Sequence, residues 1–173
     1  MVDRARMVSK YALLLFGCGF LCVGCNQDDP VWELPCEERP AREVIPGTGE
    51  GSFEAADEPL EIQYGDQGGS HIWFGVRLRG FGPEATVTHG ITHSTDPALS
   101  YSPPGQERVE LRYNSGEKAS EASGMFAFLE AYDPVTGFTT PVPSSGEKVV
   151  LWAEVIDECT PEPVRGETVA EVE

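Results

Sequence analysis

Residues 70–79 read SHIWFGVRLR, and their pattern is the clearest indication of the fold class of the chain. Its apolar residues fall on one side of an extended backbone, and they are Ile72, Phe74, Val76 and Leu78. The alternate positions would face the other way, and they are His71, Trp73, Gly75, Arg77 and Arg79. A period of two that holds along the whole stretch predicts a half-buried antiparallel β-strand.

Shorter β-like runs lie on both sides of this strand, and turn residues separate them. The runs are residues 42–45, 60–64, 85–93, 108–113, 125–131 and 148–156. They alternate apolar with polar residues or are rich in β-branched residues, and no segment shows helical periodicity. About seven strands in one domain predict an all-β fold, an immunoglobulin-like antiparallel β-sandwich. A jelly roll or a small barrel is the alternative.

The chain is strongly acidic, which limits its partners. It has 173 residues, with 12 Lys and Arg against 29 Asp and Glu, and its net charge is −17. Nucleic-acid affinity is built on clustered Lys and Arg, so this composition excludes a nucleic-acid partner. The same acidity argues against electrostatic docking on an anionic membrane.

The start of the chain has the features of an export signal. A basic region with Arg4, Arg6 and Lys10 precedes an uncharged, mainly apolar run over residues 11–24. This run is shorter than the ~20 residues that a transmembrane helix needs. The pattern predicts a secretory signal peptide over residues 1–24.

The end of this run, residues 21–25, reads LCVGC and resembles the lipobox of bacterial lipoproteins. In that family the cysteine sulfur receives a diacylglycerol, cleavage occurs just before it, and the new amino terminus is usually acylated, often with palmitate. The resemblance implies lipidation of Cys25 and a cell-envelope protein tied to the membrane by its N-terminal lipid. Asn26 follows the cysteine where aspartate would mark inner-membrane retention, which implies the outer membrane. An ordinary secreted protein is the alternative.

Composition divides the rest of the chain into three parts. Residues 25–41 are acidic and punctuated by proline, which predicts a lipidated tether with little regular structure. Residues 42–159 would form the β-sandwich domain. Residues 160–173 contain two prolines and four glutamates without apolar periodicity, which predicts a disordered acidic tail.

The five cysteines leave one pair for a disulfide if the lipobox assignment holds. Cys18 and Cys22 would leave with the signal, and Cys25 would carry the lipid. Cys36 and Cys159 then remain together in an oxidising compartment, which predicts a disulfide between them. Two unpaired thiols are the alternative. A zinc site is disfavoured because neither cysteine has a closely spaced partner.

The most distinctive local feature is QGGSH at residues 67–71. Gly68 and Gly69 permit positive φ and would make a tight entry into the following strand. Over residues 47–80 the chain resembles a group of uncharacterised bacterial lipoproteins that have a QGG-x-H turn before an alternating strand. That resemblance implies no function.

The outward face of the predicted strand carries the candidate ligand patch, His71, Trp73 and Arg77. An exposed histidine, tryptophan and arginine on one face suit a ligand or partner, for which an envelope protein or a glycan is the candidate. The structural alternative is a fixed turn followed by a histidine that hydrogen-bonds to a loop.

Metal binding and cofactors have weak support in the sequence. His89 and His93 would lie ~13 Å apart on one face of a strand, too far to share a zinc ion. Acids in predicted turns leave a loop calcium open, and they are Asp57, Glu58, Asp66, Asp133, Asp157 and Glu158. We predict no metal centre and no cofactor.

No catalytic motif is present: the sequence lacks G-x-S-x-G, H-E-x-x-H and G-x-x-x-x-G-K. The sequence therefore predicts an exported, lipid-anchored cell-envelope protein that acts as a non-enzymatic binding or structural module. An envelope hydrolase or metal-dependent enzyme on the same scaffold is the alternative, because a Ser–His–Asp triad can assemble in space.

Overall fold

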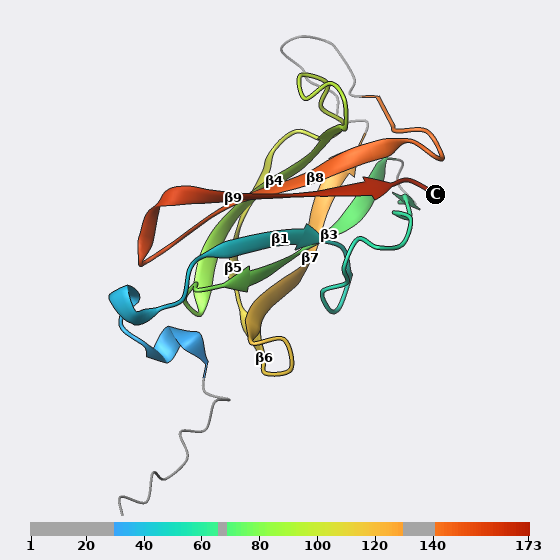
Figure 1. Cartoon of the computed structure of the whole chain (residues 1–173). Coiled ribbons are helices and arrows are strands. Elements are labelled where there is room, and N and C mark those ends of the chain that lie inside the picture. Colours follow the sequence, from blue (N-terminus) through green and yellow to red (C-terminus); the bar gives the residue numbers. More distant parts are fainter. Residues whose placement is uncertain (1–29, 66–68, 130–140) are drawn as a thin grey trace, which may run out of the picture.

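The alternating stretch forms β3 (Ser70–Arg79), an internal strand in one of two antiparallel sheets (Figure 1). The computed structural model describes residues 30–65, 69–129 and 141–173. The other strands of the first sheet are β1 (Glu43–Gly47), β2 (Gln63–Tyr64), β6 (Arg112–Asn114) and β7 (Ala119–Leu129). The second sheet contains β4 (Glu84–His93), β5 (Gly105–Glu110), β8 (Lys148–Asp157) and β9 (Thr160–Glu171). Two short 3-10 helices precede β1, η1 (Val31–Glu33) and η2 (Cys36–Glu38).

The order of the strands is that of an immunoglobulin-like sandwich. The first sheet runs β1-β3-β7-β6, with β2 pairing with β3, and the second sheet runs β5-β4-β8-β9. With the short β2 left unlettered and the other strands lettered in chain order, this arrangement is A-B-E-D packed on C′-C-F-G. The all-β, immunoglobulin-like prediction is confirmed. Among the described residues, no helix has the length and apolar character needed to cross a membrane.

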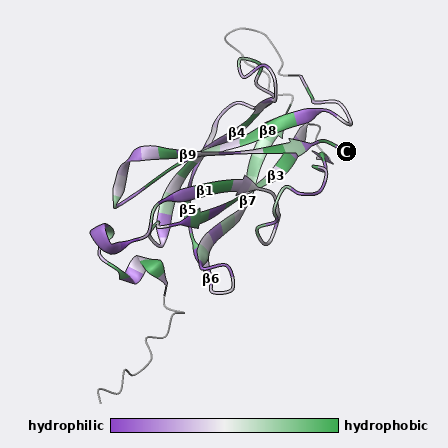
Figure 2. Cartoon of the chain, in the orientation of Figure 1, coloured by the Kyte–Doolittle hydropathy of each residue, from purple (hydrophilic) through white to green (hydrophobic). Residues whose placement is uncertain are grey.

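The core lies between the two sheets and follows the alternation seen in the sequence. On β3 the four predicted inward residues are at most 1% exposed. Opposite them, the second sheet contributes Val87, Ile91, Leu151 and Val155, all fully buried. Figure 2 shows the corresponding change between hydrophobic and hydrophilic residues along the strands. Each large aliphatic or aromatic side chain buried here stabilises the fold by about 1.5–3 kcal/mol.

Two of the predicted strands are corrected by the structure. The run 108–113 divides between β5 and β6, which belong to different sheets, because buried Leu111 turns inward at the corner. The Leu111 N–H donates to the Pro83 carbonyl at 2.8 Å and fixes this turn. The run 60–64 forms only the short β2, because Leu60 pairs with Val172 beside β9 in a parallel bridge.

The prediction of a disordered acidic tail is wrong, because Thr160–Glu171 is β9 and pairs with β8. Its partly or fully buried inward positions include Gly166 and Thr168, which carry no strong apolar signal. Small residues are needed there because β1 lies close: a Cβ on Gly166 would stand 1.9 Å from the Val44 carbonyl oxygen. Thr168 Oγ1 also donates to the Pro46 carbonyl at 2.8 Å. The β-sandwich therefore extends beyond the predicted boundary at residue 159.

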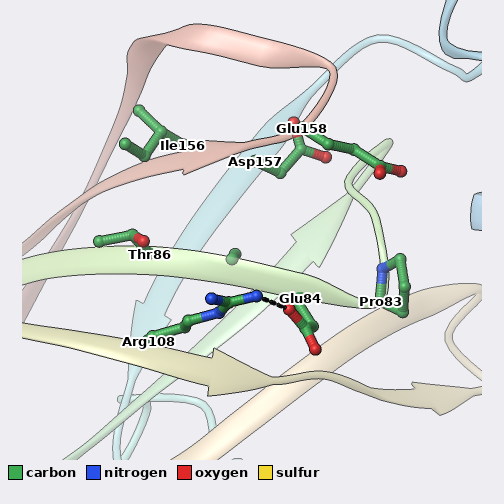
Figure 3. A pocket seen from close by; sticks show the side chains of 8 residues that line it. Pro83, Glu84, Thr86, Arg108, Ile156, Asp157 and Glu158 are labelled. Carbon is green, nitrogen blue, oxygen red and sulfur yellow. Dashed lines mark hydrogen bonds and ion pairs between the residues drawn. The ribbon is translucent and has the colours of Figure 1, made fainter.

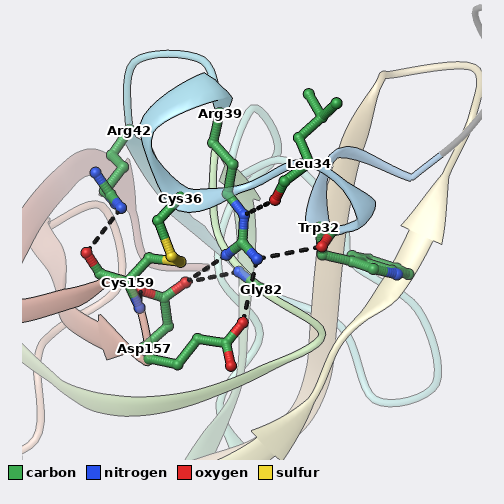
Figure 4. Close-up of polar contacts among 9 residues, drawn as sticks. Trp32, Leu34, Cys36, Arg39, Arg42, Gly82, Asp157 and Cys159 are labelled. Carbon is green, nitrogen blue, oxygen red and sulfur yellow. Dashed lines mark hydrogen bonds and ion pairs between the residues drawn. A yellow bond between two sulfur atoms is a disulfide. The ribbon is translucent and has the colours of Figure 1, made fainter.

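The predicted tether is also corrected over its described part, since residues 30–41 lie against the domain (Figure 4). The ring of Trp32 meets that of Tyr113 on β6 edge to face, at 5.6 Å between centroids. Cys36 forms a disulfide with Cys159 in the β8–β9 turn, with 5.4 Å between their Cα atoms. The predicted pairing of these two cysteines is therefore present, and residues 25–29 lie outside the described part.

Arg39 holds this N-terminal segment in place through four contacts (Figure 4). Its guanidinium donates to the carbonyls of Leu34 at 3.1 Å and Trp32 at 3.2 Å. It also pairs with the carboxylates of Glu158 at 3.1 Å and Asp157 at 3.4 Å. The side chains of Arg39 and Asp157 are almost wholly buried, so this pair is shielded from solvent.

Candidate functional site

The strongest candidate surface is an aromatic cluster on the outer face of the first sheet. We call His71, Trp73, Phe126 and Phe128 the aromatic patch. The antiparallel register of β3 and β7 places Trp73 opposite Phe126 and His71 opposite Phe128. Phe126 is 36% exposed and Phe128 is 56% exposed, so the patch meets solvent.

The four rings of the aromatic patch contact one another closely. The Trp73 and Phe126 centroids are 4.4 Å apart, and Phe126 stacks on Phe128 at 5.5 Å. The His71 ring stands edge-on to Trp73 at 5.3 Å and to Phe126 at 4.9 Å. Aromatic pairs at these separations favour offset or edge-to-face packing, which orders the rings before any partner arrives.

The sequence predicted two members of the aromatic patch and missed two. His71 and Trp73 were found through the alternation of β3. Phe126 and Phe128 lie in the wholly apolar stretch 125–129, which conceals the fact that only Met125, Ala127 and Leu129 face the core. The available signal was the period-two spacing of two phenylalanines around a small Ala127.

Arg77, the third predicted patch residue, lies further along the same face and is engaged elsewhere. Its guanidinium pairs with Glu121 at 2.8 Å and Glu117 at 3.4 Å. It also lies over the ring of buried Phe53, 4.6 Å from the centroid. The structure therefore brings His71 and Trp73 together and gives Arg77 a separate set of contacts.

Part of the QGGSH turn is described. Gln67 and Gly68 lie outside the described residues, whereas Gly69 has a φ of +92°. Its carbonyl accepts a hydrogen bond from the Gly65 N–H at 3.1 Å, which closes the turn into β3. Nε2 of His71 has no hydrogen-bond partner among the described residues.

A hollow of about 560 Å³ adjoins the aromatic patch at Trp73. We call it the β1–β2 hollow, because its walls are formed by the chain between these strands. Four exposed glutamates line it, and they are Glu50, Glu54, Glu58 and Glu61. None of them forms an ion pair with a described residue.

A second hollow, of about 420 Å³, lies on the second sheet near the β8–β9 turn (Figure 3). Its charged side chains are already paired: Arg108 with Glu84, and Asp157 and Glu158 with Arg39. The Glu84 carboxylate raises the pKa of Arg108. This hollow therefore offers a ligand few unpaired charges.

His89 is a fully buried histidine on the inner face of β4. Its ring stacks on Phe74 with 4.6 Å between centroids, and neither ring nitrogen has a hydrogen-bond partner among the described residues. Gly105 makes room for it, since a Cβ there would stand 2.7 Å from the imidazole ring. Burial lowers the pKa of His89 below 6.5, and the Glu107 carboxylate, 3.7 Å from Nε2, opposes this only in part.

Acidification is expected to destabilise the fold through His89. The unfolded chain binds a proton at this histidine below about pH 6.5, whereas the buried imidazole stays neutral until its lowered folded pKa. Its contribution to stability is therefore present above pH 6.5 and is lost as the pH falls from there, by up to about 1.4 kcal/mol per pH unit. Denaturant unfolding at a series of pH values measures this slope.

The matched variants are His89→Leu and Glu107→Gln. His89→Leu removes the titrating group, so we expect a flatter curve between about pH 6.5 and pH 5. Glu107→Gln removes the carboxylate that raises the pKa of His89. The free energy of unfolding should therefore keep falling down to a lower pH than in the unsubstituted protein. An unchanged slope in His89→Leu would show that other groups cause the acid sensitivity.

His93, Glu147 and Tyr101 form a trio of neighbouring polar side chains. Its Nδ1 accepts from the backbone N–H groups of Thr95 and Asp96, both at 3.1 Å, so Nε2 carries the proton of the neutral ring. That nitrogen lies 3.4 Å from the Glu147 carboxylate, which also accepts from the Tyr101 hydroxyl. Burial and this hydrogen bond raise the pKa of Tyr101 to about 12. The trio connects the loop after β4 to the start of β8.

The acids considered for a loop calcium do not converge in the described part of the chain. Within residues 30–65, 69–129 and 141–173, no three His, Cys, Asp or Glu side chains gather closely enough to hold a metal ion. Asp157 is committed to Arg39 and to two backbone N–H groups. Asp66 and Asp133 lie outside the described residues, as does the predicted lipidation site Cys25.

Comparisons with protein-family models, with curated proteins and with solved structures found no match.

Proposed function

We propose that this protein is an exported, lipid-anchored binding module of the cell envelope, and that the aromatic patch is its ligand surface. Lipidation at Cys25 and location at the outer membrane rest on the lipobox resemblance. The binding role rests on one observation, the cluster of four contacting rings on an outer sheet face. The proposed role is non-enzymatic.

An exposed apolar cluster of this kind supports a binding role for physical reasons. Phe126 and Phe128 add nothing to the core, because their strand neighbours Met125, Ala127 and Leu129 fill it. Large aromatic side chains in water are costly, and contiguous exposed apolar patches mark sites of interaction. Aromatic residues that are already ordered also lose little conformational entropy on binding, which suits anchor positions in an interface.

The position of the aromatic patch suits a protein that is anchored at its N-terminus. The N-terminal segment docks beside the end of β3, at the β3–β4 turn, where Gly82 lies against Arg39 and Asp157. Trp73 lies six residues before Arg79, which is roughly 20 Å along an extended strand. The point where residues 30–41 dock on the domain is therefore separated from Trp73 along the strand.

Loss of the exposed rings is expected to weaken partner binding strongly without unfolding the domain. The test variant is Phe126→Ser/Phe128→Ser in the full-length protein, purified in non-ionic detergent and used to capture partners from an envelope extract. Truncation of two anchor residues in an interface weakens binding by about tenfold or more. Capture is measured by quantitative mass spectrometry against the unsubstituted protein, and circular dichroism checks the fold.

Tyr64→Ser is the matched control. Tyr64 is 73% exposed and lies on β2 of the same sheet, but it is outside the aromatic patch. Its loss should leave capture unchanged. Equal recovery of the same partners by the double variant and the unsubstituted protein would refute the assignment of the aromatic patch.

A further inference from the structure

The pairing of β3 is interrupted beside the aromatic patch. Along one edge of β3, β1 pairs as far as Gly75, and β2 begins to pair only at His71. Among the described residues, Ile72, Trp73 and Phe74 have no strand partner on this edge. Because successive residues of a strand point their N–H and C=O groups to alternate edges, at least one of the three directs both groups away from β7.

The β1–β2 hollow lies at this interruption, and Ile72 and Trp73 line it. One wall is the loop after β1. Two backbone hydrogen bonds hold this loop in place, since the N–H groups of Thr48 and Glu54 each donate to the carbonyl of the other at 2.9 Å. The hollow therefore adjoins an unpaired stretch of strand edge on one side and the ring of Trp73 on another. This gap covers only three residues of β3 and is closed at both ends by β1 and β2, so it has room for a ligand side chain but not for an added strand.

The charge of the β1–β2 hollow selects the kind of segment that can enter it. Its four glutamates have no counter-charge among the described residues, in a chain whose net charge is −17. Negative charge of this density repels an acidic or phosphorylated segment and attracts a basic one. The neighbouring indole adds a cation–π partner for an ammonium or guanidinium group.

We propose that the β1–β2 hollow receives a basic side chain of a peptide segment that lies across the aromatic patch. This inference deepens the proposed function and rests on it: the aromatic patch holds the apolar side chains of the same segment. The partner is then a protein with an exposed Lys- or Arg-containing strand or tail.

The ring geometry favours a peptide over a glycan. A sugar ring binds by stacking on an open aromatic face, whereas Phe126 and Phe128 stack on each other with 17° between their planes. Trp73 is tilted by 38° to Phe126 at 4.4 Å, which covers part of its face as well. The rings thus leave little open face on which a sugar ring could stack, and apolar peptide side chains fit such a surface better than a sugar does.

The test is a titration of the full-length protein in detergent with a short capped peptide of alternating valine and lysine. The indole N–H resonance of Trp73 should shift, while those of Trp32, on Tyr113, and Trp152, beneath Arg165, should stay in place. Glu58→Gln/Glu61→Gln should weaken binding about tenfold, because it removes two carboxylate partners of the basic group.

Glu37→Gln/Glu38→Gln is the charge-matched control, since these exposed glutamates lie on η2, away from the hollow. It should change affinity less than about twofold. Equal weakening in both variants, or no shift of Trp73, overturns the inference. A neutral oligosaccharide that shifts Trp73 when the peptide does not also overturns it. After any of these outcomes, the proposed function would still stand if partner capture from the envelope extract continued to depend on Phe126 and Phe128.

Discussion

Asp157→Ala is expected to lower the free energy of unfolding by about 3–5 kcal/mol. The Asp157 side chain is 0% exposed, and its carboxylate faces the buried guanidinium of Arg39 at 3.4 Å. It also accepts from the N–H groups of Gly82 at 2.7 Å and Cys159 at 3.0 Å. Alanine would leave a buried cation and two backbone donors without this acceptor, and each such loss is costly. Urea unfolding measures the effect, and the m-value should stay unchanged.

The neighbouring acid provides the control for this prediction. Glu158 pairs with the same guanidinium at 3.1 Å, but its side chain is 67% exposed, so Glu158→Gln should cost less than about 1 kcal/mol. The double variant Arg39→Met/Asp157→Leu should be more stable than Asp157→Ala, because it leaves no unpaired buried charge. Equal effects of the two acid variants would contradict the role of Asp157.

Removal of the disulfide is expected to have the other large effect. Cys36→Ala/Cys159→Ala should lower the free energy of unfolding by about 4–5 kcal/mol in the chain-entropy model. The bond joins residues 123 positions apart, so the unfolded chain gains much conformational freedom when it is lost. The m-value should rise as well, because the unfolded chain becomes less compact.

Chemical reduction of the unsubstituted protein is the parallel measurement, and it should reproduce the loss seen in the double variant. If the free energy of unfolding fell by less than about 1 kcal/mol both in the double variant and in the reduced protein, the other contacts of the N-terminal segment would be sufficient to hold it in place. Asp157 and Cys159 lie in the same turn, and the Cys159 N–H donates to Asp157. Because they share this contact, the two losses should not add when the substitutions are combined.

Several elements could be predicted because their information is local. β3, β4 and β8 each have one face in the core, so alternate positions must be apolar, and this period of two is visible in the sequence. The same alternation placed His71 and Trp73 on the outer face. The disulfide followed from the two cysteines that remain when those of the proposed signal and lipobox are set aside.

Other elements could not be predicted, because their residues are determined by contacts with segments far away in the sequence. β9 has glycine and threonine at inward positions because β1 lies against it, so its sequence resembles a polar tail. Residues 30–41 look like a solvated tether because most of their charges are exposed. Arg39, however, pairs with Asp157, which lies more than a hundred residues away in the sequence.

The fold class, the inward face of the main strands and the cysteine pair could be read from the amino-acid order alone, because alternation and composition are properties of short segments. Which side chains share a surface depends instead on tertiary contacts. The register of β3 with β7 brings Phe126 and Phe128 to Trp73 and His71, and the β1–β2 hollow beside them is lined by glutamates that form no ion pair with a described residue. Register depends on how whole faces pack against one another, and no short segment encodes that relation.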